Sequence, residues 1–306
     1  MLSVLLLIVF SVVFVNGQTP VPWVNLSQLA NERQEADDFA GAEQLCREAL
    51  RLAEEKLGLV DKQLAPLLSN LALSLHFLAR DAEADPLARR AYLLAEQSGD
   101  QKLTGKVLNT LGVVLAGEGE LARAEPVLRR SVALLEQSEG AEGLDVARAA
   151  NNLSTLYADT HQFVKAEQEL ARALPIYEKH LGPELPEYAM ALGSMFTILY
   201  EQHRVAEGEP YLRRALALGE KMFPHGLNMA NLQHCLAALE ASRENYKEAA
   251  RHLEKVVAIQ ERVLGPEHPL LAHTLVNYSN VLRRLHQKNE AKQAQNRANL
   301  ILKSLH

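Results

Sequence analysis

The amino-acid sequence predicts an all-α fold, a right-handed α-solenoid superhelix of about seven stacked helix pairs. Three observations predict it. A small residue recurs every 40 to 42 positions, two further columns of residues keep the same register, and polar turns separate the segments between them. Repeats of this length indicate helical hairpins that bury their apolar faces only against one another.

The composition agrees with a soluble helical protein and excludes one class of partner. Of the 306 residues, 48% are hydrophobic and 23% are charged, and the formal net charge is −6. A protein that binds nucleic acid needs a clustered basic face, and this chain has none. We therefore expect no nucleic-acid partner.

The chain begins with an apolar segment that carries no charged side chain through residue 23. Its apolar run, residues 4–15, is too short to span a bilayer but has the length of a signal-peptide core. We expect residues 1–17 to be a signal peptide cleaved before Gln18, and residues 18–23 to be a linker. The mature protein would then be secreted or periplasmic, with no membrane span. A retained membrane anchor or a cytoplasmic chain is the alternative.

The repeat register defines the predicted solenoid, residues 24–304. Apolar residues at helical spacing give each helix a buried stripe, and small residues let paired helices approach closely. The column of small residues that opens each second helix is Ala42, Ala84, Ala124, Ala166, Gly208, Ala249 and Ala291. Thirteen positions earlier lies a column of apolar anchors, Leu29, Leu71, Leu111, Leu153, Met195, Leu236 and Tyr278. Seven positions after the small column come Ala49, Ala91, Ser131, Ala173, Ala215, Val256 and Ala298.

Turn residues divide the segments where this register requires it. Glycine follows second helices, as at Gly58 and Gly140, and short polar stretches join the two helices of a pair. Pro175 falls inside a second helix and should kink or shorten it. The last helix, residues 288–304, carries Gln295 where earlier second helices have an apolar residue. A polar outer face is typical of a terminal capping helix.

The sequence offers no pattern for catalysis or cofactor binding. It lacks a nucleophile elbow, a phosphate-binding loop and a paired-cysteine motif. His268 and His273 do not have the spacing of a helical zinc site. Cys46 and Cys235 fall in apolar helical patterns, so we expect buried free thiols. We therefore predict a non-enzymatic protein with no metal and no cofactor.

The repeat resembles the tetratricopeptide repeat in its long form of about 42 residues, which is found in kinesin light chains. The closest local matches are residues 181–186, 264–269 and 149–153, each of which precedes or opens a first helix. The resemblance covers roughly residues 22–304. It implies a scaffold that binds a protein or peptide segment, and an exposed groove would also allow self-association.

Two departures from related proteins narrow this reading. No heptad-patterned coiled coil accompanies the repeats, which disfavours an intracellular adaptor of kinesin-light-chain type. Lys106 and Asn109 match part of a constellation that holds a C-terminal carboxylate in some related domains, but we find no further members on adjacent repeats. The alternatives are such an intracellular adaptor, and a small-ligand sensor or an enzyme that uses the groove as a pocket.

The resemblance also implies where a ligand would bind, because first helices line the concave groove of this family. Residues offset by two, five or six positions from the apolar anchor should face that groove. The predicted groove-lining residues are His76, Phe77, Asn109, Asn151, Thr155, Asp159, Thr197, Tyr200, Glu201, His234, Asn280, Arg283 and Arg284.

Overall fold

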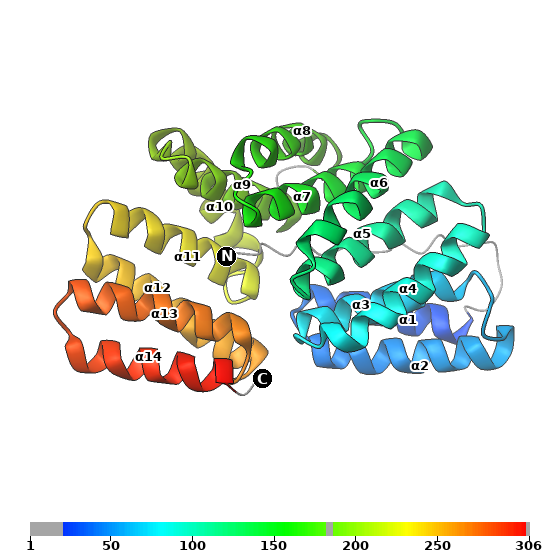
Figure 1. Ribbon diagram of the computed structural model, residues 1–306, viewed down its shortest axis with the longest axis horizontal. Helices are drawn as coiled ribbons and strands as arrows, with labels where there is room; N and C mark the ends of the chain where they lie inside the picture. Colours follow the sequence, from blue (N-terminus) through cyan, green and yellow to red (C-terminus); the bar gives the residue numbers. More distant parts are fainter. Residues whose placement is uncertain (1–20, 182–185, 304–306) are drawn as a thin grey trace. The chain divides into compact units, whose positions relative to one another are not determined.

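The computed structural model describes residues 21–181 and 186–303, which form α-helices joined by turns, with no strand in these ranges (Figure 1). The chain divides into two compact units, residues 1–180 and 181–306. The first unit contains α1 (Pro22–Glu35), α2 (Phe39–Leu57), α3 (Leu64–Phe77), α4 (Asp81–Gln97), α5 (Gln101–Gly117), α6 (Leu121–Glu139), α7 (Leu144–Asp159) and α8 (Phe163–Leu181). The second contains α9 (Pro186–Glu201), α10 (Val205–Met222), α11 (Leu227–Ser242), α12 (Tyr246–Leu264), α13 (Pro269–Arg284) and α14 (Lys288–Lys303).

Within each unit the helices pack in the order of a repeat array. First helices contact the second helix of their own pair, as α5 contacts α6, and the second helix of the preceding pair, as α5 contacts α4. First helices also contact one another, as α3 contacts α5 and α9 contacts α11. The predicted all-helical α-solenoid is therefore confirmed. Each pair buries its second face only by stacking, which is why the array is continuous within a unit.

Most residues of the predicted columns lie in the core, although the anchors Leu236 and Tyr278 are only half-buried. In the two columns on the second helices Gly208 is buried, and the other members are at most 1% exposed. The anchors Leu71, Leu111, Leu153 and Met195 are at most 5% exposed. Leu29 is different, with 40% of its surface exposed. An anchor packs between its own second helix and the preceding one, and no described pair precedes α1.

The turn within each pair repeats one backbone motif. One residue adopts a left-handed conformation, and the next N–H donates to the carbonyl five residues earlier, at 2.7–3.0 Å in all seven turns. This is the Schellman arrangement, which satisfies carbonyls left open at a helix end. The left-handed residues are Asp37, Ala79, Gly119, His161, His203, Glu244 and His286. Six of the seven are not glycine, so the sequence alone gave little sign of this shared turn.

We expect Ala79→Gly to stabilise the protein and Gly119→Ala, at the equivalent position, to destabilise it. Ala79 has φ 56°, where a Cβ costs about 1–2 kcal/mol, partly offset by the greater freedom of glycine in the unfolded chain. No atom lies within 4 Å of a Cβ built on Gly119, so its penalty is purely conformational. Urea unfolding should show a gain of about 0.5 kcal/mol for the first variant and a loss of about 1 kcal/mol for the second. Changes of the same sign would contradict the prediction.

Ion pairs link second helices of successive pairs at equivalent positions. An arginine on one second helix contacts a glutamate on the preceding second helix, at 2.7 Å or less. The pairs are Arg90–Glu54, Arg130–Glu96, Arg172–Glu136 and Arg297–Glu261. All four ion pairs are partly exposed, so each adds about 1 kcal/mol at most to the free energy of unfolding. Their main effect is on the register between successive second helices.

Two sequence-based expectations about helix ends differ from the structure, and a third concerns residues that the structure does not describe. α1 begins at Pro22, so the predicted linker, residues 18–23, is too long by two residues. Pro175 does not shorten its helix, since α8 continues to Leu181 and matches α6 in length at 19 residues. The predicted signal peptide, residues 1–17, lies outside the described residues.

The last helix, α14, buries only Ala291, Ala294, Ala298 and Ile301.

Candidate functional site

The predicted groove residues divide into buried and accessible groups. Five have side chains that are buried in the described part of the chain. They are His76, Phe77, Asn109, Asn151 and His234, each at most 9% exposed. Thr155, Asp159, Thr197 and Tyr200 are half-buried, and Glu201, Asn280, Arg283 and Arg284 are exposed.

The buried group is explained by contacts between successive first helices. Asn152 Nδ2 donates to Asn109 Oδ1 at 3.1 Å, which joins α7 to α5. Asn277 Nδ2 and His234 Nε2 lie 3.0 Å apart and join α13 to α11. Residues near the anchors therefore meet the neighbouring first helix. Helical spacing fixes their angle on the helix but not what lies beside them.

His76 and Phe77 are held by neighbouring helices of the first two pairs. His76 Nδ1 lies 2.5 Å from Asp81 Oδ1, at the start of α4. The Phe77 ring stacks on Phe39 of α2, with centroids 4.5 Å apart and an angle of 18° between planes. Both side chains serve packing and helix-end contacts, so neither is presented to a ligand.

The accessible residues form small groups on single helices. Thr155 Oγ1 donates to the Asn151 carbonyl on α7 at 3.1 Å. On α13, Arg283 donates to Asn280 Oδ1 at 3.0 Å, and Arg284 lies 5.6 Å from the Tyr246 ring centroid. These groups remain candidates for ligand contact, because their polar atoms are near solvent.

A charged cluster between α5 and α7 was not predicted from the sequence. Asp145 lies 3.5 Å from both Lys102 Nζ and Lys106 Nζ, and 3.1 Å from Arg148 Nη1. Lys102 also contacts Glu139 at 2.7 Å. The side chains of Lys106, Asp145 and Arg148 are only 10–11% exposed. Three cations and two carboxylates thus meet at one edge of the first-helix surface.

This cluster corrects the sequence-based reading that Lys106 and Asn109 lack basic or asparagine neighbours on an adjacent repeat. α7 supplies Arg148 and Asn152 beside them. Arg148 follows Lys106 by 42 positions, which is the repeat length, so the same register that revealed the core columns would have paired them. Burial lowers the pKa of Lys106, with Asp145 acting in the opposite direction.

Asn151 is the least satisfied polar group of this region. It is fully buried, and neither its Oδ1 nor its Nδ2 has a hydrogen-bond partner. A buried polar group without a partner costs about 1–3 kcal/mol. Asn151 lies on α7, three residues after Arg148 and four before Thr155. A side-chain amide both donates and accepts hydrogen bonds, so it can pair with the carbonyl and the N–H of a peptide backbone.

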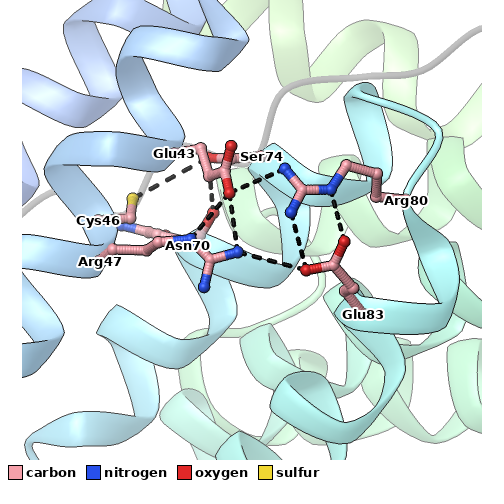
Figure 2. Close-up of polar contacts among 7 residues, drawn as sticks. All are labelled: Glu43, Cys46, Arg47, Asn70, Ser74, Arg80 and Glu83. Atoms are coloured by element: carbon pink, nitrogen blue, oxygen red, sulfur yellow. Dashed lines mark hydrogen bonds and ion pairs between the residues drawn. The ribbon is translucent and has the colours of Figure 1, made fainter.

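A second group of polar residues joins α2, α3 and the start of α4 through ion pairs and hydrogen bonds (Figure 2). Arg80 contacts Glu43 at 2.9 Å and Glu83 at 2.6 Å, and Arg47 contacts both glutamates. Behind it, the Cys46 thiol lies 3.9 Å from the Ser74 hydroxyl. Burial raises the pKa of Cys46 to about 12, so this thiol is no nucleophile near neutral pH.

Cys46 and Cys235 are both free and buried, as predicted. Within residues 21–181 and 186–303, no three histidine, cysteine or acidic side chains are arranged to hold a metal ion. In the same part of the chain, no helix is both long enough and apolar enough to cross a membrane.

Comparison with known proteins supports the repeat assignment. Two tetratricopeptide repeat models match, one over residues 103–179 and 228–298 and the other over residues 26–61. No curated protein sequence matches the chain.

Solved structures resemble the fold at low sequence identity. Kinesin light chain nearly identical TPR-like repeats from Podosopora anserina are 20% identical, with a TM-score of 0.53, and the match covers 66% of this chain and 96% of that one. The Rap conjugation gene regulator of plasmid pLS20, in complex with the Phr* peptide, is 11% identical with a TM-score of 0.73 and coverage of 92% and 74%. A Rap protein complexed with competence and sporulation factor is 15% identical, with a TM-score of 0.72 and coverage of 92% and 75%.

Proposed function

Because this chain belongs to the tetratricopeptide repeat family, we propose that it is a non-catalytic scaffold that binds a peptide segment of a partner protein. The segment would lie along first helices, over α5 and α7 of the first unit. One of the similar structures is a complex with a peptide, which supports this class of ligand.

The unpartnered amide of Asn151 is the observation that carries the proposal. The amide is covered in the free chain, so a peptide would reach it by displacing the side chains that cover it. The peptide backbone would then supply an acceptor for Nδ2 and a donor for Oδ1, which removes the cost of leaving both buried without partners. Thr155 continues the same face of α7 and is half-buried. A side chain that binds the peptide backbone accepts many peptide sequences, as a general scaffold requires.

The neighbouring cations favour a segment that carries a carboxylate. Lys106 and Arg148 lie within 3.5 Å of Asp145, in a region where little water screens their charge. A carboxylate on the segment would share these cations with Asp145. An arginine fork matches a carboxylate geometrically, which adds orientation as well as affinity.

The test compares partner capture by the native chain and by Asn151→Leu, with crosslinking before purification. Leucine keeps the branched shape, is larger, and removes the donor and acceptor of the amide, so binding should fall about tenfold or more. Asn296→Leu, on the exposed face of α14, is the matched control and should bind normally. Full capture of every partner by a folded Asn151→Leu chain would rule out this surface.

A second variant tests the first helices of the other unit. Tyr200→Ala combined with Arg283→Ala removes two predicted ligand contacts on α9 and α13. Loss of capture in this variant alone would place the ligand on the second unit and remove the role proposed for α5 and α7.

We propose also that residues 1–17 direct export and are then removed. The absence of charge through residue 23 and the apolar run of residues 4–15 support this. Fusing residues 1–25 to a reporter tests it. Cleavage near Gln18 and an exported reporter are expected, and an uncleaved reporter retained in the cytoplasm would contradict the proposal.

A further inference from the structure

The connection between α2 and α3 exposes two aliphatic side chains side by side in sequence. Leu59 is 63% exposed and Val60 is 81% exposed, and Asp61 follows this pair in the sequence. Val60 is the most exposed large hydrophobic residue in the part of the chain that the structure describes. Single exposed aliphatic residues are ordinary, but an adjacent pair on a turn is a candidate contact.

An apolar cleft lies between α4 and α6, over α5. Its volume is about 520 Å³, which is large enough for two or three side chains. Leu93 on one wall is 55% exposed, although it lies within a helix. The rest of the apolar lining is Tyr92, Leu108, Leu111, Pro126 and Val127.

The charges around the cleft complement those of the turn. Its two charged lining residues are Arg89 on α4 and Arg130 on α6. They contact Asp85 and Glu96, and these are partly exposed ion pairs that exchange partners at little cost. A carboxylate that follows two aliphatic residues, as Asp61 does, would reach such an arginine while the aliphatic side chains fill the cleft.

The turn and the cleft border the same helix. Arg90 Nη2, on α4, donates to the Leu59 carbonyl at 2.7 Å, and Arg90 is adjacent to Arg89 in the cleft lining. A protrusion and a complementary cleft on one surface allow a two-fold arrangement, in which each copy inserts into the other and the assembly closes as a dimer.

We propose that the occupant of the α4–α6 cleft is a second copy of this chain, which inserts Leu59 and Val60 between Tyr92 and Val127. Asp61 of the inserted turn pairs with Arg130. The cleft is bordered by the second helices α4 and α6, whereas the proposed peptide surface is on first helices, so a dimer would leave peptide binding available to both copies.

Sedimentation equilibrium of the full chain over a wide concentration range tests the proposal. The native chain should have the mass of a dimer. Val60→Asp and Leu93→Asp place a charge in the interface and should each weaken the dimer by about a hundredfold or more. Both positions are exposed within the chain, so the variants should fold. Val164→Asp, at a position 64% exposed on α8, between the exposures of Val60 and Leu93, is the control and should remain dimeric.

A disulfide experiment tests the pairing itself. Chains with Val60→Cys mixed with chains carrying Val127→Cys should form a crosslinked species of doubled mass, while the native Cys46 and Cys235 are buried and do not react. A native chain that stays monomeric, with the cleft open to other proteins, would overturn the proposal. A dimer that persists in both aspartate variants would also overturn it, because its interface would lie elsewhere.

Discussion

Replacing Phe196 with alanine is expected to lower the free energy of unfolding by about 3–5 kcal/mol. Phe196 is 1% exposed and packs with Leu212, Cys235 and Leu239 in one buried cluster of the second unit. Removing the ring loses its transfer free energy and leaves a cavity that rigid helices fill only in part. Urea unfolding followed by circular dichroism measures the change, and Leu300→Ala, at a position 68% exposed, is the control. A loss below about 1 kcal/mol would contradict this packing.

The same ring explains the one glycine in the column of small residues. The position after the anchor is small in the other six pairs, where it is Ala30, Ala72, Gly112, Ser154, Ala237 and Ser279. A Cβ on Gly208 would lie 3.2 Å from Phe196 Cδ2 and 3.3 Å from Leu199 Cβ. Gly208→Ala should therefore cost about 1–3 kcal/mol alone. In the double variant with Phe196→Ala the two losses should not add, because the new methyl group enters the cavity.

Replacing Asp145 with asparagine is expected to cost about 3 kcal/mol near neutral pH. The change keeps the shape of the side chain but leaves Lys106 and Arg148 buried without their common carboxylate. Burial alone would raise the pKa of Asp145, but Lys106, Arg148 and Lys102 outweigh it and hold the pKa below its ordinary value. Glu248→Gln removes an exposed pair with Arg251 and should cost about 1 kcal/mol at most.

The Asp145 contribution should depend on pH in a defined direction. Because the folded-state pKa is lowered, the stabilisation is fully present above the unfolded value of about 4 and is lost as the pH falls through the folded value. Urea unfolding of both chains should show the native advantage at neutral pH and its decline below about pH 4. An advantage that stays constant over this range would mean that Asp145 acts through packing and not through charge.

Most of the fold could be predicted because it depends on local chemistry repeated in register. Small residues such as Ala84 and Ala166, with apolar anchors such as Leu71 at fixed spacing, require paired helices that stack. The sequence did not show that Ala79 and His161 are left-handed, because the surrounding hydrogen bonds impose that conformation on residues that do not prefer it. Nor did it show that Pro175 would be accommodated without shortening α8.

The sequence by itself determined the pairing and order of the helices, since helical periodicity and turn residues are properties of neighbouring positions. Only the tertiary structure decided which polar faces are buried. Asn109 and Asn280 were both predicted to line the groove, yet Asn109 bonds to the next first helix and Asn280 reaches solvent. Periodicity gives the direction of a side chain from its own helix axis, and burial depends on which other helix occupies that direction.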